Sequence, residues 1–404
     1  MRIALLTTYS HGGAGIACGR LQRALQRIGL DAQMLTAADT SSRWPFYAER
    51  LSFLPFERDR SVRFLFSLAN YGCDLSRHPV VQQADIIHLH WVNQGFLSLR
   101  GIRQLAETGK PLVWTLHDMW VFTGGCHHSA GCEGYLHTCG HCPMLRWRGP
   151  RDLSYRIWQH KKRLFPSNMY FVACSQWMSQ RAQRSSLLGS YPIRVIPNAI
   201  DTELFAPITE EQRSAFRRRL GISPGAVLAL FASVKLENPW KGFSYLVQAI
   251  QHLYQQHPAI PVELMVMGKA RPNTLRALPC RVHLLGTLSE VRQIAEAYAA
   301  ADLFVIPSVE ENLPNTVMEA LACGTPVAGF RTGGIPEMVE HEQNGYLAPV
   351  GDSKALACAI RWVAERSNQL RAAARAKAER CYEQSVVASH HLAYYQQALQ
   401  EVNQ

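Results

Sequence analysis

The sequence contains no long hydrophobic run. No stretch approaches the roughly 20 consecutive apolar residues that a membrane-spanning helix requires. The apolar part of the opening MRIALLTTY is too short for the core of a signal peptide and ends without a cleavage site. Low-complexity segments and short repeats are lacking as well. We therefore expect a globular protein that starts and stays in the cytoplasm.

Acidic residues are scarce in the first half of the chain. Residues 1–200 contain 23 Lys and Arg against 11 Asp and Glu, whereas residues 201–404 contain 19 and 20, so the first half supplies all of the net charge of +11. A basic balance often indicates nucleic acid. A one-sided excess fits an anionic membrane surface or a phosphate-bearing acceptor equally well.

The cysteines do not follow the pattern of a secreted disulfide scaffold, because 11 is an odd number and 404 residues is a long chain. Four of them nevertheless crowd into 17 residues, with histidines nearby: Cys126, Cys132, Cys139 and Cys142. In a cytoplasmic protein such clustering suggests a structural zinc site with four thiolates, or with a histidine replacing one. Buried free thiols and a labile disulfide remain open as alternatives.

Short apolar strands alternate with helical patterns along the chain. In the first half, the predicted strands cover 3–7, 32–35, 85–89, 112–116, 169–173 and 193–196, and the predicted helices cover 14–28, 97–107, 154–164 and 175–187. The segment 196–207 interrupts the alternation. It restarts with strands at 227–231, 262–267, 303–306 and 327–330, helices at 243–256, 289–300 and 315–322, and a helical tail over 352–404.

This alternation predicts an α/β fold in which parallel sheets are covered by helices on both faces. At about 100–200 residues per domain, the chain has room for two such units. We predict a Rossmann-like N-terminal domain over 1–198 with a cysteine-rich insert at 123–143, a Rossmann-like C-terminal domain over 199–380, and a final helix over 381–404 that packs back towards the first domain. Doubly wound sheets bind ligands at the carboxyl ends of their strands, which predicts a ligand cleft there.

Two glutamates flank the start of the helix predicted at 315–322. Glu311 lies in the loop before it and Glu319 within it. The N–H groups at the helix start, around Asn315 and Thr316, lie at the positive end of the helix dipole and are a natural seat for a diphosphate. Glu319 would then bind a ribose and Glu311 a transferred sugar. For an isolated pair of glutamates, a solvated loop acid and an exposed helix residue would be the better interpretation.

The surroundings of this pair favour the ligand-binding interpretation. The two glutamates, with seven residues between them, are followed by ALACGTPV, GGIPEMV and NGYL, and this pattern resembles the signature of the retaining GT-B glycosyltransferases of family 4. The resemblance covers essentially the whole chain. It implies two Rossmann-like domains facing across a cleft and a nucleotide-diphosphate sugar as donor. It also implies donor contacts from Glu311, Asn312, Leu313, Pro314, Asn315 and Glu319, although the family's usual Gly-Phe-Gly is Asn-Leu-Pro here.

A cation is expected to neutralise the leaving diphosphate, because negative charge grows on it in the transition state. Family members usually place an arginine soon after the strand predicted at 227–231 and a Lys-Gly pair further on. Lys241 matches the second feature, so the resemblance implies a catalytic, phosphate-binding role for it. The arginine is missing. Lys235 is either its substitute, with a point charge in place of a bidentate fork, or a surface lysine.

The first domain offers further candidates where predicted strands end. Gly12 and Gly13 precede a helix, where the family brings a glycine loop to the donor phosphate or the acceptor. A dinucleotide-binding loop is the alternative, but Asp39 comes too late to supply its ribose-binding acid. His117 corresponds to a family histidine near the reacting sugar, although a packing histidine would look the same. The position of Ser175 corresponds to a site-facing serine of the family and is also typical of a helix N-cap.

The sequence offers no obvious second carboxylate on the acceptor side to act as a nucleophile. This disfavours double displacement and favours a front-face mechanism, in which the leaving phosphate takes the proton of the acceptor. An Asp-x-Asp metal motif is lacking too. We therefore expect a metal-independent reaction that requires no cofactor beyond the donor.

The His-Asp-x-Trp motif and the cysteine-rich insert resemble an exopolysaccharide subgroup of the family, of the colanic-acid type. This resemblance implies a glycan acceptor on a polyprenyl-diphosphate lipid and no nucleic-acid partner. Segments 43–71 and 146–163 interleave basic and aromatic residues, which is typical of a membrane interface or a nucleic-acid surface, although a solvated helix face is the default. We expect peripheral contact with the inner face of the cytoplasmic membrane. A non-catalytic sugar-nucleotide sensor or scaffold and a nucleotide-sugar epimerase stay open as alternatives.

Overall fold

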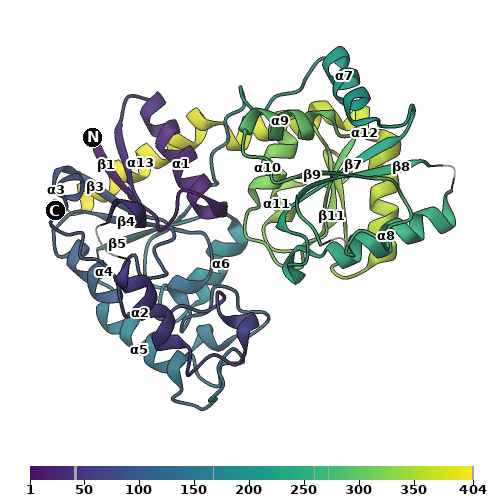
Figure 1. Cartoon of the computed structure of the whole chain (residues 1–404). Helices are drawn as coiled ribbons and strands as arrows, with labels where there is room; N and C mark the ends of the chain where they lie inside the picture. Colours follow the sequence, from purple (N-terminus) through teal and green to yellow (C-terminus); the bar gives the residue numbers. More distant parts are fainter. Residues whose placement is uncertain (41–42, 167, 259, 272, 403–404) are drawn as a thin grey trace. The chain divides into compact units, whose positions relative to one another are not determined.

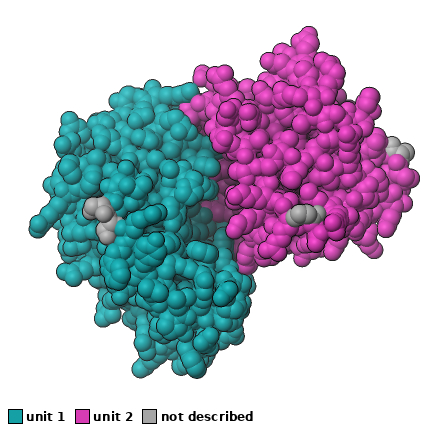
Figure 2. Space-filling model, in the orientation of Figure 1, with its two compact units in different colours: residues 1–199, 385–404 teal, residues 200–384 magenta. Residues whose placement is uncertain are grey.

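The computed structural model divides the chain into two compact units. It describes residues 1–40, 43–166, 168–258, 260–271 and 273–402. The first unit contains residues 1–199 and 385–404, and the second contains residues 200–384 (Figure 2). The predicted divisions at 198 and 380 thus differ from the observed ones by one and four residues.

The first unit is built on a six-stranded parallel sheet in the order β2-β1-β3-β4-β5-β6 (Figure 1). The strands are β1 (Arg2–Leu6), β2 (Asp31–Leu35), β3 (Ile86–Leu89), β4 (Leu112–Leu116), β5 (Met169–Ala173) and β6 (Ile193–Val195). The chain crosses from β2 past β1 to β3. The sheet therefore has its topological switch point between β1 and β3, the place where open α/β sheets bind ligands.

Helices cover both faces of this sheet because side chains alternate along each strand. Ile3 and Leu5 of β1 face α1 and α13, whereas Ala4 and Leu6 face α4, α5 and α6. These helices and the shorter ones of the unit are α1 (Gly12–Arg27), α2 (Trp44–Phe53), α3 (Pro79–Gln83), α4 (Leu99–Ala106), α5 (Leu153–Leu164), α6 (Gln176–Arg184) and α13 (Gln384–Val402), with single 3₁₀ turns at Ala37–Asp39, Arg60–Val62, Trp120–Phe122 and Gly134–Leu136. The last helix is thus part of the core of the first unit.

The second unit repeats the architecture with the order β12-β11-β10-β7-β8-β9. Its strands are β7 (Val227–Lys235), β8 (Val262–Lys269), β9 (Val282–Gly286), β10 (Leu303–Ile306), β11 (Val327–Phe330) and β12 (Gly345–Ala348). Its helices are α7 (Glu210–Leu220), α8 (Phe243–Gln256), α9 (Val291–Ala300), α10 (Asn315–Ala322), α11 (Ile335–Met338) and α12 (Ser353–Tyr382), with a 3₁₀ turn at Pro239–Lys241. The order reverses between β7 and β10, which is the switch point of this sheet.

The helical tail predicted over 352–404 is two helices rather than one. α12 ends at Tyr382, Glu383 has extended ψ and forms a bridge with Ile200, and α13 begins at Gln384. α12 packs on the core of the second unit and α13 on that of the first. The break at Glu383 therefore lets one tail serve both units. The predicted end of the tail, residues 403 and 404, lies outside the described residues. Among the residues that the structure describes, no helix is both long and apolar enough to cross a membrane.

Candidate functional site

The switch point of the second unit brings together two loops that carry predicted site residues. Lys241 lies in the loop after β7, and Glu311 lies in the loop after β10. The two loops are joined by a bond from the Val309 N–H to the Trp240 carbonyl at 3.0 Å. Residues 70 positions apart in the sequence therefore meet at the ligand-binding edge of the sheet.

Two glycines allow these loops to pack closely. A Cβ atom on Gly242 (φ +67°) would lie 1.8 Å from the carbonyl oxygen of Pro307, and one on Gly333 (φ +55°) would lie 1.6 Å from that of Glu311. Both positions need a positive φ and the absence of a side chain. The N–H of Gly334 also binds the Glu311 carbonyl at 3.1 Å. The backbone at Glu311 is thus held from two sides.

Lys241 and Glu311 form an ion pair through Nζ and Oε1. The hydroxyl of Ser308 donates to the same carboxylate oxygen at 3.1 Å. The side chain of Glu311 is 15% exposed and that of Lys241 is 35% exposed, so the pair is reachable from solvent. An ammonium beside a held carboxylate can bind an anion and a hydroxyl side by side. Lys241 is therefore a partly exposed lysine with a carboxylate partner, and its role in binding stays a prediction.

The helix α10 begins where predicted, directly after this loop. Pro314 is its N-cap residue and Asn315 its first residue, so its opening N–H groups lie at the loop end of the helix. Leu313 is buried, which leaves its backbone rather than its side chain to contact a ligand. Glu319 is 8% exposed. The alternative interpretation of Glu319 as an exposed helix residue is therefore wrong.

The remaining predicted cation, Lys235, ends β7, and its side chain is exposed. Its backbone carbonyl accepts the hydroxyl of Ser233 at 2.8 Å. This bond involves only the backbone of Lys235 and says nothing about the role of its ammonium group. The geometry therefore does not decide between a substitute for the missing arginine and a surface lysine.

The switch point of the first unit brings the loops after β1 and β3 together. The N–H of Thr8 binds the carbonyl of Trp91 at 2.7 Å, and the ring of Tyr9 stacks on that of Trp91 with centroids 6.0 Å apart. Gly12 (φ +73°) and Gly13 open α1 directly after this contact. Apart from adjacent residues and the backbone of α1 itself, no atom of the described residues lies within 4 Å of a Cβ built on either glycine. The space above the glycine loop is thus open, as a ligand-binding loop requires.

His117, directly after β4, is a half-buried histidine held by its neighbours. Its Nε2 lies 2.8 Å from Nδ1 of His90, and its Nδ1 lies 3.9 Å from the thiol of Cys174. Burial lowers the pKa of His117 to about 4, against a smaller opposing effect of Asp118. The ring is therefore neutral near neutral pH. This environment fits both interpretations of His117, as a packing residue and as a residue near the reacting sugar.

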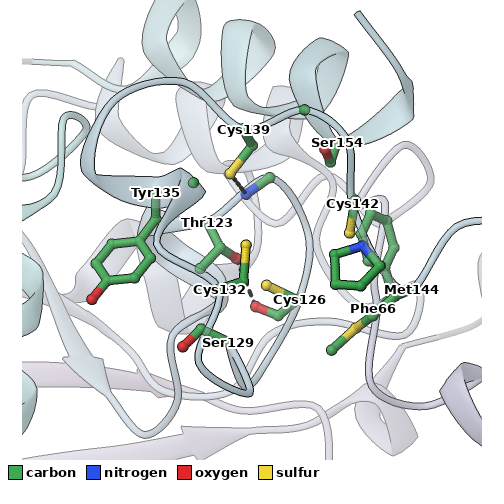
Figure 3. Close-up of a pocket in the computed structure, with 14 residues that line it drawn as sticks. Phe66, Thr123, Cys126, Ser129, Cys132, Tyr135, Cys139, Cys142, Met144 and Ser154 are labelled. Carbon is green, nitrogen blue, oxygen red and sulfur yellow. Dashed lines mark hydrogen bonds between the residues drawn. The ribbon is translucent and has the colours of Figure 1, made fainter. Parts of the chain in front are cut away.

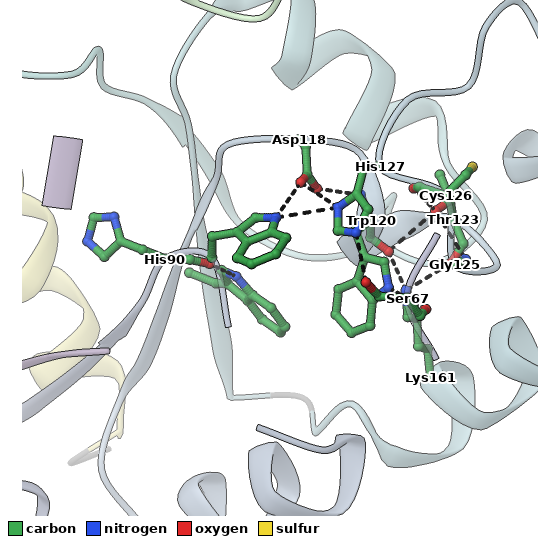
Figure 4. A network of polar contacts seen from close by, with 11 residues as sticks. Ser67, His90, Asp118, Trp120, Thr123, Gly125, Cys126, His127 and Lys161 are labelled. Carbon is green, nitrogen blue, oxygen red and sulfur yellow. Dashed lines mark hydrogen bonds and ion pairs between the residues drawn. The ribbon is translucent and has the colours of Figure 1, made fainter. Parts of the chain in front are cut away.

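Asp118 joins the strand end to the cysteine-rich insert (Figure 4). Its carboxylate lies 2.6 Å from Nδ1 of His127 and accepts the indole N–H of Trp91 at 2.8 Å. Burial alone would raise the pKa of Asp118, but the charge and hydrogen bond of His127 outweigh it and lower the pKa to about 2. Nε2 of His127 contacts the Ser67 hydroxyl at 2.9 Å. Three loops are therefore tied to one buried carboxylate.

Ser175 is the N-cap of α6, and its hydroxyl accepts the N–H of Met178 at 3.1 Å. The side chain is fully buried. The capping interpretation is therefore confirmed. A ligand contact by Ser175 stays a prediction.

Two family models match the chain, largely one in each unit. The model described as Glycosyltransferase Family 4 matches residues 11–204, and the model described as Glycosyl transferases group 1 matches residues 227–366. A D-inositol 3-phosphate glycosyltransferase of Xylanimonas cellulosilytica is 34% identical over 399 residues, which cover 91% of this chain and 87% of that protein. The chain belongs to the family 4 glycosyltransferases. The predicted family is confirmed.

Two other proteins resemble this glycosyltransferase. The putative colanic acid biosynthesis glycosyl transferase WcaC of Escherichia coli is 28% identical over 271 residues, covering 65% of this chain and 62% of that protein. The crystal structure of Anabaena HepE in complex with UDP aligns with a TM-score of 0.64 at 22% identity and covers 98% of this chain and 100% of that one. The similarity to HepE concerns the fold alone. It agrees with the two Rossmann-like sheets and confirms the predicted GT-B class.

The cysteine-rich insert of the glycosyltransferase lines a small pocket (Figure 3). Cys126, Cys132, Cys139 and Cys142 all border it, and none of them is in a disulfide. Burial raises the pKa of Cys139 to about 11 and that of Cys142 to about 12. Within the described ranges, no group of three or more His, Cys, Asp or Glu side chains already surrounds a metal position. The labile disulfide, one of the alternatives left open by the sequence, is not formed here.

Sequence analysis of the glycosyltransferase missed the partners of its strand-end residues. His90 and Trp91 follow β3 at the same sheet edge as His117. The motif His-Leu-His-Trp could therefore have indicated these two residues as neighbours of the candidate site. Lys161 was assigned to a basic surface segment, which is wrong because the side chain is fully buried. Trp158 in the same segment is buried as well. A sequence window identifies a basic segment but not which of its residues face inward.

Proposed function

We propose that this glycosyltransferase is a retaining, metal-independent enzyme that transfers a sugar from a nucleoside-diphosphate sugar. The observation that carries the proposal is the Lys241–Glu311 ion pair beside the start of α10, at the switch point of the second sheet. This arrangement combines a cation, helix-start N–H groups and a held carboxylate. A diphosphate needs the first two, and the hydroxyls of a sugar need the third.

In the proposed complex, Lys241 turns from Glu311 to the diphosphate of the donor. The N–H groups of Asn315 and the preceding loop bind the phosphate oxygens, and Glu311 accepts hydroxyl groups of the transferred sugar. Glu319 accepts a ribose hydroxyl, for which its partial burial is suitable, since a carboxylate shielded from water binds hydroxyls more strongly. Lys241 between Glu311 and the diphosphate also reduces the repulsion between two anionic groups.

The proposed chemical step takes place on one face of the sugar. The bond from the anomeric carbon to the diphosphate oxygen breaks, and the acceptor hydroxyl forms its new bond from the same side, so the configuration is retained. The acceptor proton moves to the leaving phosphate oxygen. Lys241 and the start of α10 stabilise the charge that develops on this oxygen, the role that a bound metal has in other transferases.

His117 contributes its position rather than proton transfer in this proposal. Its ring nitrogens already contact His90 and Cys174, and its pKa of about 4 keeps the ring neutral. A neutral, fixed residue at the end of β4 can direct its main-chain carbonyl to the positive charge at the anomeric carbon. His90 then acts as a positioning residue for His117. Gly12 and Gly13 provide the open backbone for the acceptor or the donor phosphate.

The acceptor in this proposal is a glycan on a diphosphate-linked lipid at a membrane surface. Trp44, Tyr47 and Leu51 are exposed on one face of α2, at helical spacing. Phe64 and Trp147 are exposed as well: the guanidinium of Arg50 in α2 lies over the Phe64 ring, and the N–H of Arg146, next to Trp147, binds the carbonyl of Phe56. Exposed aromatic residues flanked by arginines favour an anionic membrane interface. Flotation with anionic vesicles should therefore be sensitive to salt, and a Trp44→Ala, Trp147→Ala variant should float less than the unaltered enzyme.

Donor turnover tests the proposal directly. The purified enzyme, treated with a chelator, is incubated with UDP-glucose and other nucleoside-diphosphate sugars, because HepE was solved in complex with UDP-glucose. Released nucleotide and the anomeric configuration of the product are measured by NMR. We expect turnover that Glu311→Gln abolishes and that Glu296→Gln, at an exposed ion pair, preserves. Inversion of configuration, or recovery of activity only with added metal, would contradict the mechanism.

The acceptor is tested by comparing two arms. One contains a polyprenyl-diphosphate glycan and the other D-inositol 3-phosphate, since the named relative from Xylanimonas acts as a D-inositol 3-phosphate glycosyltransferase. Transfer to the lipid-linked glycan supports the proposal, and transfer to inositol phosphate replaces its acceptor part. Binding of donor without any turnover would indicate a sensor or scaffold, and an altered nucleotide sugar without transfer would indicate an epimerase.

A further inference from the structure

The four cysteines of the insert converge on one cavity although they lie on separate turns. Cys126 and Cys132 flank a loop, and Cys139 and Cys142 flank the next one (Figure 3). The cavity is about 20 Å³ and is bordered by thiols and by apolar groups such as Phe66. A water molecule needs two to four polar partners, which such walls do not favour. Sulfur ligands suit a thiophilic cation instead.

Backbone N–H groups are directed at two of these sulfur atoms. The N–H of Gly124 donates to Sγ of Cys139 at 3.1 Å, and the N–H of Met144 bonds to the thiol of Cys142 two residues before it. Hydrogen bonds of this kind favour the thiolate over the thiol. Cys139 and Cys142 also have the two-residue spacing of paired metal ligands. These two bonds thus oppose the effect of burial, which raises the pKa of both thiols.

A buried cation lies beside the same cluster. Lys161 is fully buried, and its ammonium donates to the carbonyls of Trp120 and Thr123, the latter at 3.0 Å, while it lies 3.5 Å from the centre of the Trp120 ring (Figure 4). Within the described part of the chain, no carboxylate forms an ion pair with it. Burial lowers the pKa of Lys161 to about 7, and Cys126, Cys139 and Asp118 act in the opposite direction. A buried charge is costly unless an opposite charge compensates it.

We propose that Cys126, Cys132, Cys139 and Cys142 bind one Zn²⁺ ion as thiolates, with Lys161 as the charge partner of the site. Each thiol releases its proton to solvent when it binds, so the four-thiolate zinc complex has a charge of −2. Lys161 compensates half of that charge from within the protein. This is a structural site, because four protein ligands leave no open position for a substrate.

Binding requires the thiols to turn towards the cavity centre, because in the described residues no three ligands already surround a common point. In the proposed complex, each thiol turns by rotation about its Cα–Cβ bond between staggered positions. The consequence reaches the candidate site. The insert also carries His127, which holds Asp118 next to His117. Zinc would therefore fix the loop that positions the strand end of β4.

The experiment uses the full chain and cobalt as a spectroscopic probe. Zinc is measured by mass spectrometry in protein purified without a metal-affinity step. A sample freed of metal by denaturation with chelator is then refolded with Co²⁺. We expect one zinc per chain, and one cobalt per chain with sulfur-to-cobalt charge-transfer bands and the intense visible bands of a tetrahedral site. Absence of both the zinc and the bands, or an intact mass showing disulfides within the insert, would overturn the proposal.

Matched cysteine variants show whether this cluster is the site. Cys126→Ser and Cys142→Ser should lose the charge-transfer bands and most of the zinc, whereas Cys358→Ser, at an exposed position on α12, should keep both. If the first two variants do not fold, Lys161→Met in the otherwise unaltered chain is measured instead. It should keep the cobalt spectrum and bind zinc at least about tenfold more weakly, and unchanged binding would overturn the role of Lys161.

Discussion

Lys241 is the residue on which the proposed chemistry depends most. It combines partial exposure with a fixed carboxylate partner, so a donor can draw its ammonium away without breaking the fold. We predict that Lys241→Met lowers kcat by about 10²–10³, the usual effect of removing one group that stabilises transition-state charge. Lys241→Arg should recover part of this loss. Lys354→Met, at an exposed position on α12, serves as the control and should match the unaltered enzyme in steady-state kinetics.

The prediction for Lys241 also has a signature that distinguishes chemistry from binding. If the residue acts on the leaving group, kcat falls more than KM rises. A change in KM alone, with kcat preserved, would contradict a transition-state role and assign the residue to ground-state binding of the donor.

Gly333 is a residue whose role is steric. A Cβ atom there would lie 1.6 Å from the Glu311 carbonyl oxygen, and φ is +55°. We predict that Gly333→Ala lowers the free energy of unfolding by about 2–5 kcal/mol, because left-handed strain adds to overpacking. Gly225→Ala is a matched control: φ is +76°, but nothing lies within 4 Å of the added Cβ, so its cost is about 1–2 kcal/mol. Urea unfolding measures both, and equal losses would contradict the close contact.

At the scale of elements, α13 is fastened to the first sheet by a buried polar contact as well as by apolar packing. The hydroxyl of Tyr395 lies 2.6 Å from Nδ1 of His88, whose other nitrogen lies 2.7 Å from the Thr115 hydroxyl. We predict that Tyr395→Phe lowers the free energy of unfolding by about 1–3 kcal/mol, because it leaves a buried ring nitrogen without its partner. Tyr47→Phe, at an exposed position, should change it by less than about 0.5 kcal/mol. Similar effects of the two variants would contradict the contact.

Sequence patterns predicted the elements that are buried on both faces. β4, β5, β10 and β11 match their predicted bounds because fully buried strands read as continuous apolar runs between turns. β9 was missed because it lies at the edge of its sheet and its side chains are only half-buried. α2 was missed because its exposed face is apolar, which hides the usual helical contrast.

The residues of the candidate site that stand in one sequence motif were predictable. The contacts that form only when distant segments pack together were not. Glu311 and Glu319 stand in a recognisable pattern, whereas the bonds from His90 to His117 and from His127 to Asp118 join residues far apart in sequence or hidden in the insert. Burial also changed the meaning of single residues. Lys161 reads as part of a basic surface in sequence and is one of the most buried side chains in the fold.

On the scale of the whole molecule, the two units differ in the surroundings of their histidine side chains. In the first unit, the buried His88, His90 and His391 and the half-buried His117 form one aromatic group, with the His88 and His90 rings 4.5 Å apart. Burial lowers the pKa of each of them, to about 4 for His117 and about 3 for His391. In the second unit, the buried His283 has a carboxylate partner, Glu263, at 2.6 Å. Acid should therefore destabilise the first unit through these histidines.

The direction of this pH dependence follows from the difference in proton binding between the folded and the unfolded state. Between an unfolded pKa of 6.5 and a folded pKa of about 3, the unfolded state binds the proton of His391 and the folded state does not. Stability is thus retained above pH 6.5 and falls as pH decreases, by about 1.4 kcal/mol per pH unit for each such histidine. Seven of the nine tryptophans lie in the first unit, so their fluorescence in urea mainly reports its unfolding. We predict a steep loss of stability below pH 6.5, a slope reduced by His391→Gln, and an unchanged slope in His160→Gln, because His160 is exposed on α5. Equal slopes in all three proteins would contradict the role of the buried histidines.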